Sequence, residues 1–410
     1  IDFFWIAAIG LVVLTALYTI FGGMKSVLYT SVLQTPILLL GSLIILVLGF
    51  KELGGWDEMM RVCGAVTVND YGDTMTNLIR SNDDANFPWL GALIGSAIIG
   101  FWYWCTDQFI VQRVLSGKNE MEARRGTIFG AYLKLLPVFL FLIPGMIAFA
   151  LHQKYIGAGG EGFLPMLANG TANADAAFPT LVAKLLPAGV KGLVVCGILA
   201  ALMSSLASLF NSSAMLFTID FYKRFRPETP EKKLVGIGQV ATVVIVILGI
   251  LWIPIMRSVG DVLYTYLQDV QSVLAPGIAA AFLLGICWKR TSAQGGMWGL
   301  IAGMVIGLTR LGAKVYYSNA GEVADSTFKY LFYDMNWLFF CGWMFLFCII
   351  VVIVVSLATK APTAEKIQGL VFGTATKEQK AATRASWNHW DIIHTVIILA
   401  ITGAFYWYFW

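Results

Sequence analysis

The chain has 410 residues, of which 58% are hydrophobic and only 13% charged, and its mean hydropathy is +0.74. This composition excludes a soluble globular domain and indicates an integral membrane protein. The net charge of +4 is spread over many loops, so no basic face points to nucleic acid as a partner. The six cysteines form no CxxC pair and have no histidine at ligand spacing, so we expect neither a zinc site nor a disulfide framework.

Apolar runs of about 20 residues, the length needed to cross a bilayer as a helix, recur along the whole chain. They lack the alternation of a lipid-facing barrel strand, and only helices or closed barrels satisfy their backbone in lipid. The sequence therefore predicts an all-α, polytopic membrane protein. Its ten transmembrane helices are expected near residues 3–20, 27–50, 88–106, 124–151, 188–217, 233–255, 261–288, 294–317, 336–358 and 391–410.

Lysine and arginine gather in alternate loops, among them 113–125, 223–233 and 360–384. Because such residues are retained on the cytoplasmic side, these loops are predicted to be internal. The acidic loop 51–87 and both ends of the chain are then predicted to be external.

The third run ends in GFWYWCTDQFIVQR, residues 100–113, where aromatic rings give way to polar side chains. An aromatic belt at the membrane interface is one interpretation. The other is a helix that unwinds where it lines a cavity, which accounts better for Thr106, Asp107 and Gln108 following at once.

Three further places put polar groups inside apolar runs. Lys134 lies about 15 Å from the cytoplasmic end of its helix, which suits either an ion pair or a ligand contact. Gln268 and Gln271 share a helix face and could bind a polyhydroxylated or amide ligand, or join two helices. The serine-rich run at 188–217 favours close helix packing, with a cation site held by hydroxyls and free carbonyls as the alternative.

Four stretches of the sequence resemble the sodium:solute symporter family and, within it, the sodium/glucose cotransporter branch. They are GLVVLTALYTIFGGMKS at 10–26, FWYWCTDQFIVQRVLSGKNE at 101–120, YLQDVQSVLAPGIAAAFLLG at 266–285 and GICWKRTSAQGGMWGLIAG at 285–303. The resemblance implies a LeuT-type inverted-repeat transporter core within fourteen transmembrane helices, of which ten are present here and the first four are expected to be missing. It also implies a division into residues 1–50, the last two helices of the first repeat; 51–87, an extracellular loop; 88–288, the second repeat; and 289–410, three peripheral helices with a cytoplasmic amphipathic linker.

The same resemblance implies roles for individual residues. Lys134 and Gln268 would hydrogen-bond sugar hydroxyls, and Tyr103 would stack on the sugar ring as the inner gate. Trp104 would lie beside Tyr103, and Gln108 would support the gate. The sodium ion would be coordinated by the carbonyl of Ala201 and the hydroxyls of Ser204 and Ser205. The sequence departs from the branch at Tyr29-Thr30-Ser31, where Ser31 replaces an aspartate on the expected inner path of the cation.

The function so implied is sodium-coupled symport of galactose or a related hexose across the bacterial inner membrane, by a multi-pass protein that is not an enzyme. A sodium symporter for a non-sugar solute, such as an amino acid, a vitamin or an anion, is the first alternative, and a passive channel is the second. A membrane-embedded enzyme is disfavoured, because the apolar runs contain no histidine–carboxylate cluster and no nucleophile–base pair.

Overall fold

The computed structural model describes residues 3–167, 170–257, 263–319 and 324–409. Within these ranges the secondary structure is helical, and β pairing is limited to two isolated bridges, Thr67 with Thr74 and Met166 with Ala172. Nine helical segments there are long and apolar enough to cross a membrane, and the bent pair of α3 and α4 makes a tenth. The prediction of an all-α, multi-pass membrane protein is therefore confirmed.

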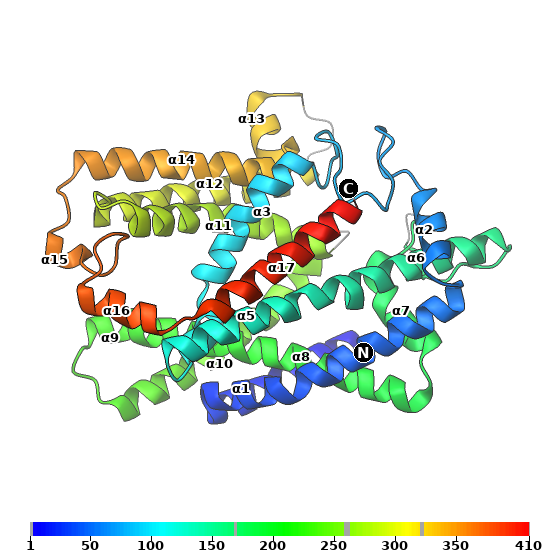
Figure 1. The fold of residues 1–410 in the computed structure, drawn as a ribbon, viewed down its shortest axis with the longest axis horizontal. Coiled ribbons are helices and arrows are strands. Elements are labelled where there is room, and N and C mark those ends of the chain that lie inside the picture. Colours follow the sequence, from blue (N-terminus) through cyan, green and yellow to red (C-terminus); the bar gives the residue numbers. More distant parts are fainter. Residues whose placement is uncertain (1–2, 168–169, 258–262, 320–323, 410) are drawn as a thin grey trace. The chain divides into compact units, whose positions relative to one another are not determined.

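The chain divides into two compact units, which Figure 1 draws together. The first unit comprises residues 1–66 and 131–258, and the second comprises residues 67–130 and 259–410. Helix α5 (Glu120–Pro137) begins in the second unit and continues into the first.

The first unit contains the segments from α1 to α2 and from the end of α5 to α10. They are α1 (Phe3–Leu53), α2 (Trp56–Gly64), η1 (Val138–Leu142), α6 (Ile143–Gly157), η2 (Ala174–Ala176), α7 (Ala177–Leu185), α8 (Ala188–Met215), η3 (Leu216–Tyr222), α9 (Lys223–Phe225) and α10 (Glu231–Arg257). Segment η1 is a π-helix that starts directly after Pro137. Proline has no backbone N–H to donate, so the regular α-helical pattern is interrupted there.

Helix α1 contains two apolar segments that are each long enough to cross a membrane, Phe4–Gly22 and Gln34–Leu53. The Tyr18 hydroxyl donates to the Met203 carbonyl, and the Ser31 hydroxyl shares a hydrogen bond with the hydroxyl of Ser204, the next residue of α8. A straight helix would separate Tyr18 from Ser31 by about 20 Å along its axis. The chain therefore turns between these two residues, as the separate apolar runs in the sequence predict.

The second unit is built around three helices that lie side by side in Figure 1, α11, α12 and α14. Its elements are α3 (Trp89–Cys105), α4 (Gln108–Leu115), α11 (Leu263–Cys287), α12 (Ala293–Asn319), α13 (Thr327–Lys329), η4 (Tyr330–Asp334), α14 (Trp337–Ala358), α15 (Ala364–Ile367), α16 (Lys377–Ala385) and α17 (His389–Tyr408). A core of buried side chains joins α3, α11 and α14, with Ile98, Ala275 and Leu338 among its members.

Small residues bring α11 and α12 into backbone contact. A Cβ atom added at Gly303 would lie only 2.9 Å from the Gly277 Cα, and one added at Gly307 would lie 2.4 Å from the Val273 carbonyl oxygen. Such close approach is typical of membrane helices, whose association depends on van der Waals packing rather than on the hydrophobic effect.

Candidate binding site

The span that starts at Trp89 breaks at Thr106. Helix α3 ends at Cys105, α4 begins at Gln108, and the two axes differ by 48°. The Thr106 hydroxyl donates to the Trp102 carbonyl over 2.7 Å, and the Asp107 carboxylate accepts from the Phe109 N–H over 3.0 Å. The bond from Phe109 caps the start of α4, whose first N–H groups have no helical acceptor, whereas the Thr106 hydroxyl adds to the bonds that the Trp102 carbonyl already accepts from the backbone at the end of α3. The prediction that the helix is interrupted after its aromatic residues is confirmed, whereas the cavity that it was expected to line there stays a prediction.

The aromatic side chains before this break contact one another. The ring centroids of Tyr103 and Trp104 are 5.2 Å apart with an interplanar angle of 89°, and those of Trp102 and Tyr103 are 6.1 Å apart. Edge-to-face pairs of this kind restrict the orientation of both rings. Half of the Trp104 surface is exposed, whereas Tyr103 is partly buried. Tyr103 thus contacts an aromatic side chain on either side of it in the sequence, shortly before the bend between α3 and α4.

Gln268 and Asp269 are neighbours on α11 but have different partners. The Gln268 amide donates to the Tyr264 hydroxyl over 3.3 Å, one turn away on the same helix. The Asp269 carboxylate forms an ion pair with Lys314 at 2.5 Å and lies 3.7 Å from Arg310, both on α12. Neighbouring positions on α11 thus contact different groups: Gln268 a residue of its own helix, and Asp269 the basic residues of α12.

Arg310 and Lys314 were not identified from the sequence as candidate site residues. Two basic residues four positions apart in an apolar run could have indicated a buried charged site, because they share a helix face and are costly in a membrane. Arg310 is completely buried and donates to the Met335 carbonyl over 2.7 Å. Its guanidinium carbon lies 4.0 Å from the centroid of the Phe340 ring. The charges on α11 and α12 therefore form one cluster, which we call the Asp269 cluster (Asp269, Arg310 and Lys314).

The predicted sodium ligands lie on one turn of α8 in the first unit. Ala201 and Ser205 line a cavity of about 260 Å³, together with Leu38 from α1 and two aromatic side chains, Phe141 and Phe178. Ser204 does not line it; the Ser204 side chain is buried, and its hydroxyl lies 2.5 Å from the hydroxyl of Ser31. Ser31 is the residue at which the sequence departs from the family pattern. Its hydroxyl therefore contacts one of the predicted sodium ligands, Ser204.

The predicted sodium ligands on this turn of α8 are neutral oxygen atoms. No group of three or more His, Cys, Asp or Glu side chains that could hold a metal ion occurs in the described parts of the chain. Hydroxyl and carbonyl oxygens can bind a monovalent cation but would hold a transition metal poorly.

The remaining predicted sugar contact, Lys134, lies in the first unit, three residues before Pro137 on α5. Its side chain is exposed. Lys134, Ala201, Ser204 and Ser205 therefore belong to one unit, whereas Tyr103, Trp104, Gln108 and Gln268 belong to the other.

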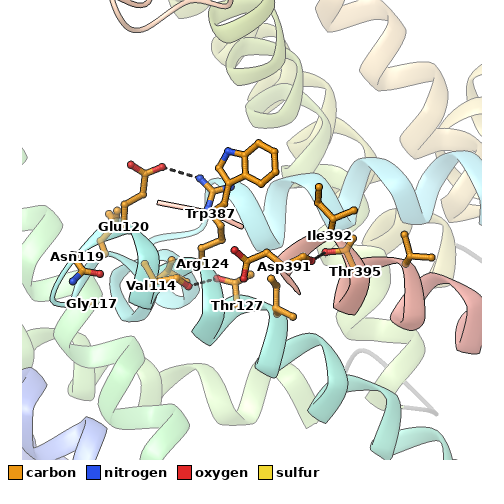
Figure 2. A pocket seen from close by; sticks show the side chains of 14 residues that line it. Val114, Gly117, Asn119, Glu120, Arg124, Thr127, Trp387, Asp391, Ile392 and Thr395 are labelled. Carbon is orange, nitrogen blue, oxygen red and sulfur yellow. Dashed lines mark hydrogen bonds and ion pairs between the residues drawn. The ribbon is translucent and has the colours of Figure 1, made fainter. Parts of the chain in front are cut away.

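A larger hollow of about 880 Å³ lies in the second unit, where the starts of α5 and α17 meet (Figure 2). Its walls are mostly apolar. On its rim Arg124 pairs with Glu120 at 2.8 Å and donates to Ser386 over 3.2 Å. The Asp391 carboxylate accepts from the Asn388 N–H at the start of α17. None of the residues predicted to bind sugar or sodium lines this hollow.

Comparisons with known proteins agree with the sequence resemblance. The sequence profile of the sodium:solute symporter family matches residues 4–303. The chain is 35% identical to the bovine sodium/mannose cotransporter, over 99% of this chain and 72% of the relative. It is 35% identical to the human sodium/myo-inositol cotransporter 2, over 90% of this chain and 56% of the relative. It is 38% identical to the sheep sodium/glucose cotransporter 1, over 87% of this chain and 56% of the relative.

A solved structure shows the same fold. It is a substrate-bound, outward-open sialic acid symporter that is coupled to Na⁺; it matches with a TM-score of 0.64 at 20% identity, over 86% of this chain and 66% of that one. The chain thus spans between 56% and 72% of the length of the cotransporters described above.

Proposed function

Because the chain belongs to the sodium:solute symporter family, we propose that it carries out sodium-coupled symport of a sugar, with galactose or a related hexose as the solute. The observation that carries this proposal is its identity of 35–38% to cotransporters named for mannose, myo-inositol and glucose. These solutes are six-carbon polyols, and recognising them requires hydrogen-bonding groups together with an apolar surface for the ring.

The side chains at the proposed sugar site have this chemistry. The Gln268 amide has two donors and an acceptor, and Lys134 has three donors, so both can bond to hydroxyl groups. Tyr103 offers an aromatic face to the ring, with Trp104 packed edge-on against it. Gln108, the first residue of α4, lies at the break behind these rings and is the proposed support of the gate.

The proposed sodium site lies on α8. The Ala201 carbonyl and the Ser204 and Ser205 hydroxyls supply three oxygen ligands from one helical turn. Helix geometry alone cannot complete the shell of a hard cation, so further oxygens must come from other segments of the protein. Ser31, already in contact with Ser204, adds a neutral hydroxyl next to this set where an aspartate would add a charge.

The transport cycle that follows is alternating access. Sodium stabilises the outward-open state, the sugar binds, and the repeats rock so that release follows movement of Tyr103. One Na⁺ moving through about 100 mV supplies about 2.3 kcal/mol, which supports roughly 50-fold accumulation of sugar.

The proposed division of the chain is the one that the resemblance implies: residues 1–50 end the first repeat, 51–87 form the outer loop, 88–288 form the second repeat, and 289–410 are peripheral. Location in a bacterial inner membrane is also part of the proposal. It rests on the resemblance of the sequence, since the cotransporters compared above are mammalian.

The test is uptake of radiolabelled galactose, glucose, mannose, myo-inositol and proline by proteoliposomes that contain the full-length protein. We expect saturable, sodium-dependent uptake of at least one hexose, with a loss of about 100-fold or more in Gln268→Ala, because two or more hydrogen bonds to the solute are removed. Lys134→Ala should have a similar effect, whereas Lys232→Ala, which removes an exposed lysine at the start of α10, should not.

Each alternative has its own result. Uptake of proline in preference to the sugars would favour a symporter for another solute, and flux that neither saturates nor depends on sodium would favour a channel. Unchanged hexose uptake in both Gln268→Ala and Lys134→Ala would refute the proposed sugar site.

A further inference from the structure

The turn of α8 that bears the proposed sodium ligands is bonded to α1 on both sides of the turn in α1. The Tyr18 hydroxyl donates to the Met203 carbonyl over 2.7 Å, and Ser31 contacts Ser204. Met203 lies between Ala201 and Ser204, so the bond from Tyr18 falls in the middle of the ligand-bearing turn.

The bond from Tyr18 is additional to the helical hydrogen bonding of α8. A helical carbonyl normally accepts one bond, from the N–H four residues later, and its second lone pair is free for another donor. A phenol that donates to this lone pair restrains the tilt of the peptide group, and hence the rotation of the turn about the axis of α8.

Tyr18 is itself held in place. Ala16 packs with Phe210 of α8 and Val246 of α10 in a buried cluster, and the Gln239 amide of α10 donates to the Ile20 carbonyl over 3.3 Å. The segment that carries Tyr18 is therefore fixed on both sides of the residue, which lets the hydroxyl act as a fixed point for α8.

We propose that Tyr18 is a positioning residue for the cation site: its hydroxyl holds the turn Ala201–Ser205 so that the carbonyl and hydroxyl ligands converge. This inference rests on the proposed function, because it takes the ligands from that proposal. Tyr18 does not itself touch the ion. Its role is to reduce the reorganisation that the turn would otherwise undergo when sodium binds.

The variant Tyr18→Phe removes only the hydroxyl. The matched control is Thr15→Val on the same segment, because the Thr15 hydroxyl is buried but donates within its own helix, to the Leu11 carbonyl over 2.7 Å. If the inter-helical bond positions the ligands, the two variants should differ in sodium affinity although each loses one hydroxyl.

The experiment is a thermal unfolding titration of the full-length protein with NaCl, at constant ionic strength maintained by choline chloride. Sodium binding raises the unfolding temperature according to its affinity, and this readout needs no sugar. We expect the half-effective sodium concentration to rise about 3- to 10-fold in Tyr18→Phe, the effect of one lost hydrogen bond, and to stay within twofold in Thr15→Val. In uptake assays the KM for the hexose at saturating sodium should not change.

Two results would overturn the inference: an unchanged sodium midpoint in Tyr18→Phe, or an equal rise in Thr15→Val, which would indicate general loosening of α1. Failure of sugar uptake with a normal sodium titration would refute the proposed solute but leave the role of Tyr18 standing. A wild-type protein that sodium does not stabilise would refute both.

Discussion

Replacing Asp269 by Asn should destabilise the second unit more than any other single change in the Asp269 cluster that leaves Arg310 in place. The carboxylate compensates two cations: Lys314, at 2.5 Å, and Arg310, which is completely buried. Its removal leaves both positive charges on α12 without a counter-charge in the cluster.

The magnitude follows from these environments. Removing one partner of a buried ion pair costs about 3–5 kcal/mol. The lower end applies here, because Arg310 keeps its bond to the Met335 carbonyl and its contact with Phe340. By contrast, Lys314→Met leaves Asp269 opposite Arg310 with balanced charge, so its cost should be about 1 kcal/mol.

Scanning fluorimetry of the purified protein measures both variants. A loss of about 3 kcal/mol corresponds to a fall in Tm on the order of 5–10 °C, and Lys314→Met should lower Tm by only about 2–4 °C. The double variant Asp269→Asn/Lys314→Met removes one uncompensated charge and should be more stable than Asp269→Asn alone. Equal stability of the two single variants would refute the assignment of Asp269 as the shared counter-charge.

Two other predictions concern packing and the loop between α2 and α3. Gly307→Ala should lower the free energy of unfolding by about 1–3 kcal/mol in thermal unfolding, because the added Cβ would lie 2.4 Å from the Val273 carbonyl oxygen. Gly312→Ala on the same helix is the control: its added Cβ has no atom within 4 Å, so it should be neutral or slightly stabilising. Equal effects of the two variants would contradict this packing. Hydrogen bonds from the Asn69 side chain and the Ser81 N–H hold the pKa of Asp73 below its usual value, so this carboxylate stabilises the loop above about pH 4 and ceases to do so as the pH falls through its lowered pKa. Hydrogen exchange of loop 67–87 should therefore be faster in Asp73→Asn than in the wild type at pH 7, and this difference should shrink as the pH falls below about 4. A difference that stays constant as the carboxylate of Asp73 becomes protonated would count against this role.

The sequence predicted the spans and the break after Cys105 because both depend on local composition: apolar length in the first case, and rings followed at once by polar residues in the second. It did not predict the partners of Asp269, because a hydropathy average over 294–317 hides Arg310 and Lys314. It noted Ser31 only as a departure from a pattern, since the contact with Ser204 joins residues 173 positions apart. The assigned roles of Lys134, Gln268 and Tyr103 remain predictions, because the structure describes their two units separately.

The contact between Gly277 and Gly303 has a mechanical consequence. Where two helices meet backbone to backbone, no side chain at the contact can change rotamer to let one helix slide past the other. The Asp269 cluster ties the same pair, α11 and α12, a second time. In the proposed function the solute contacts Gln268, and any force that it exerts there would be transmitted to both helices. We therefore expect α11 and α12 to move together as one rigid body.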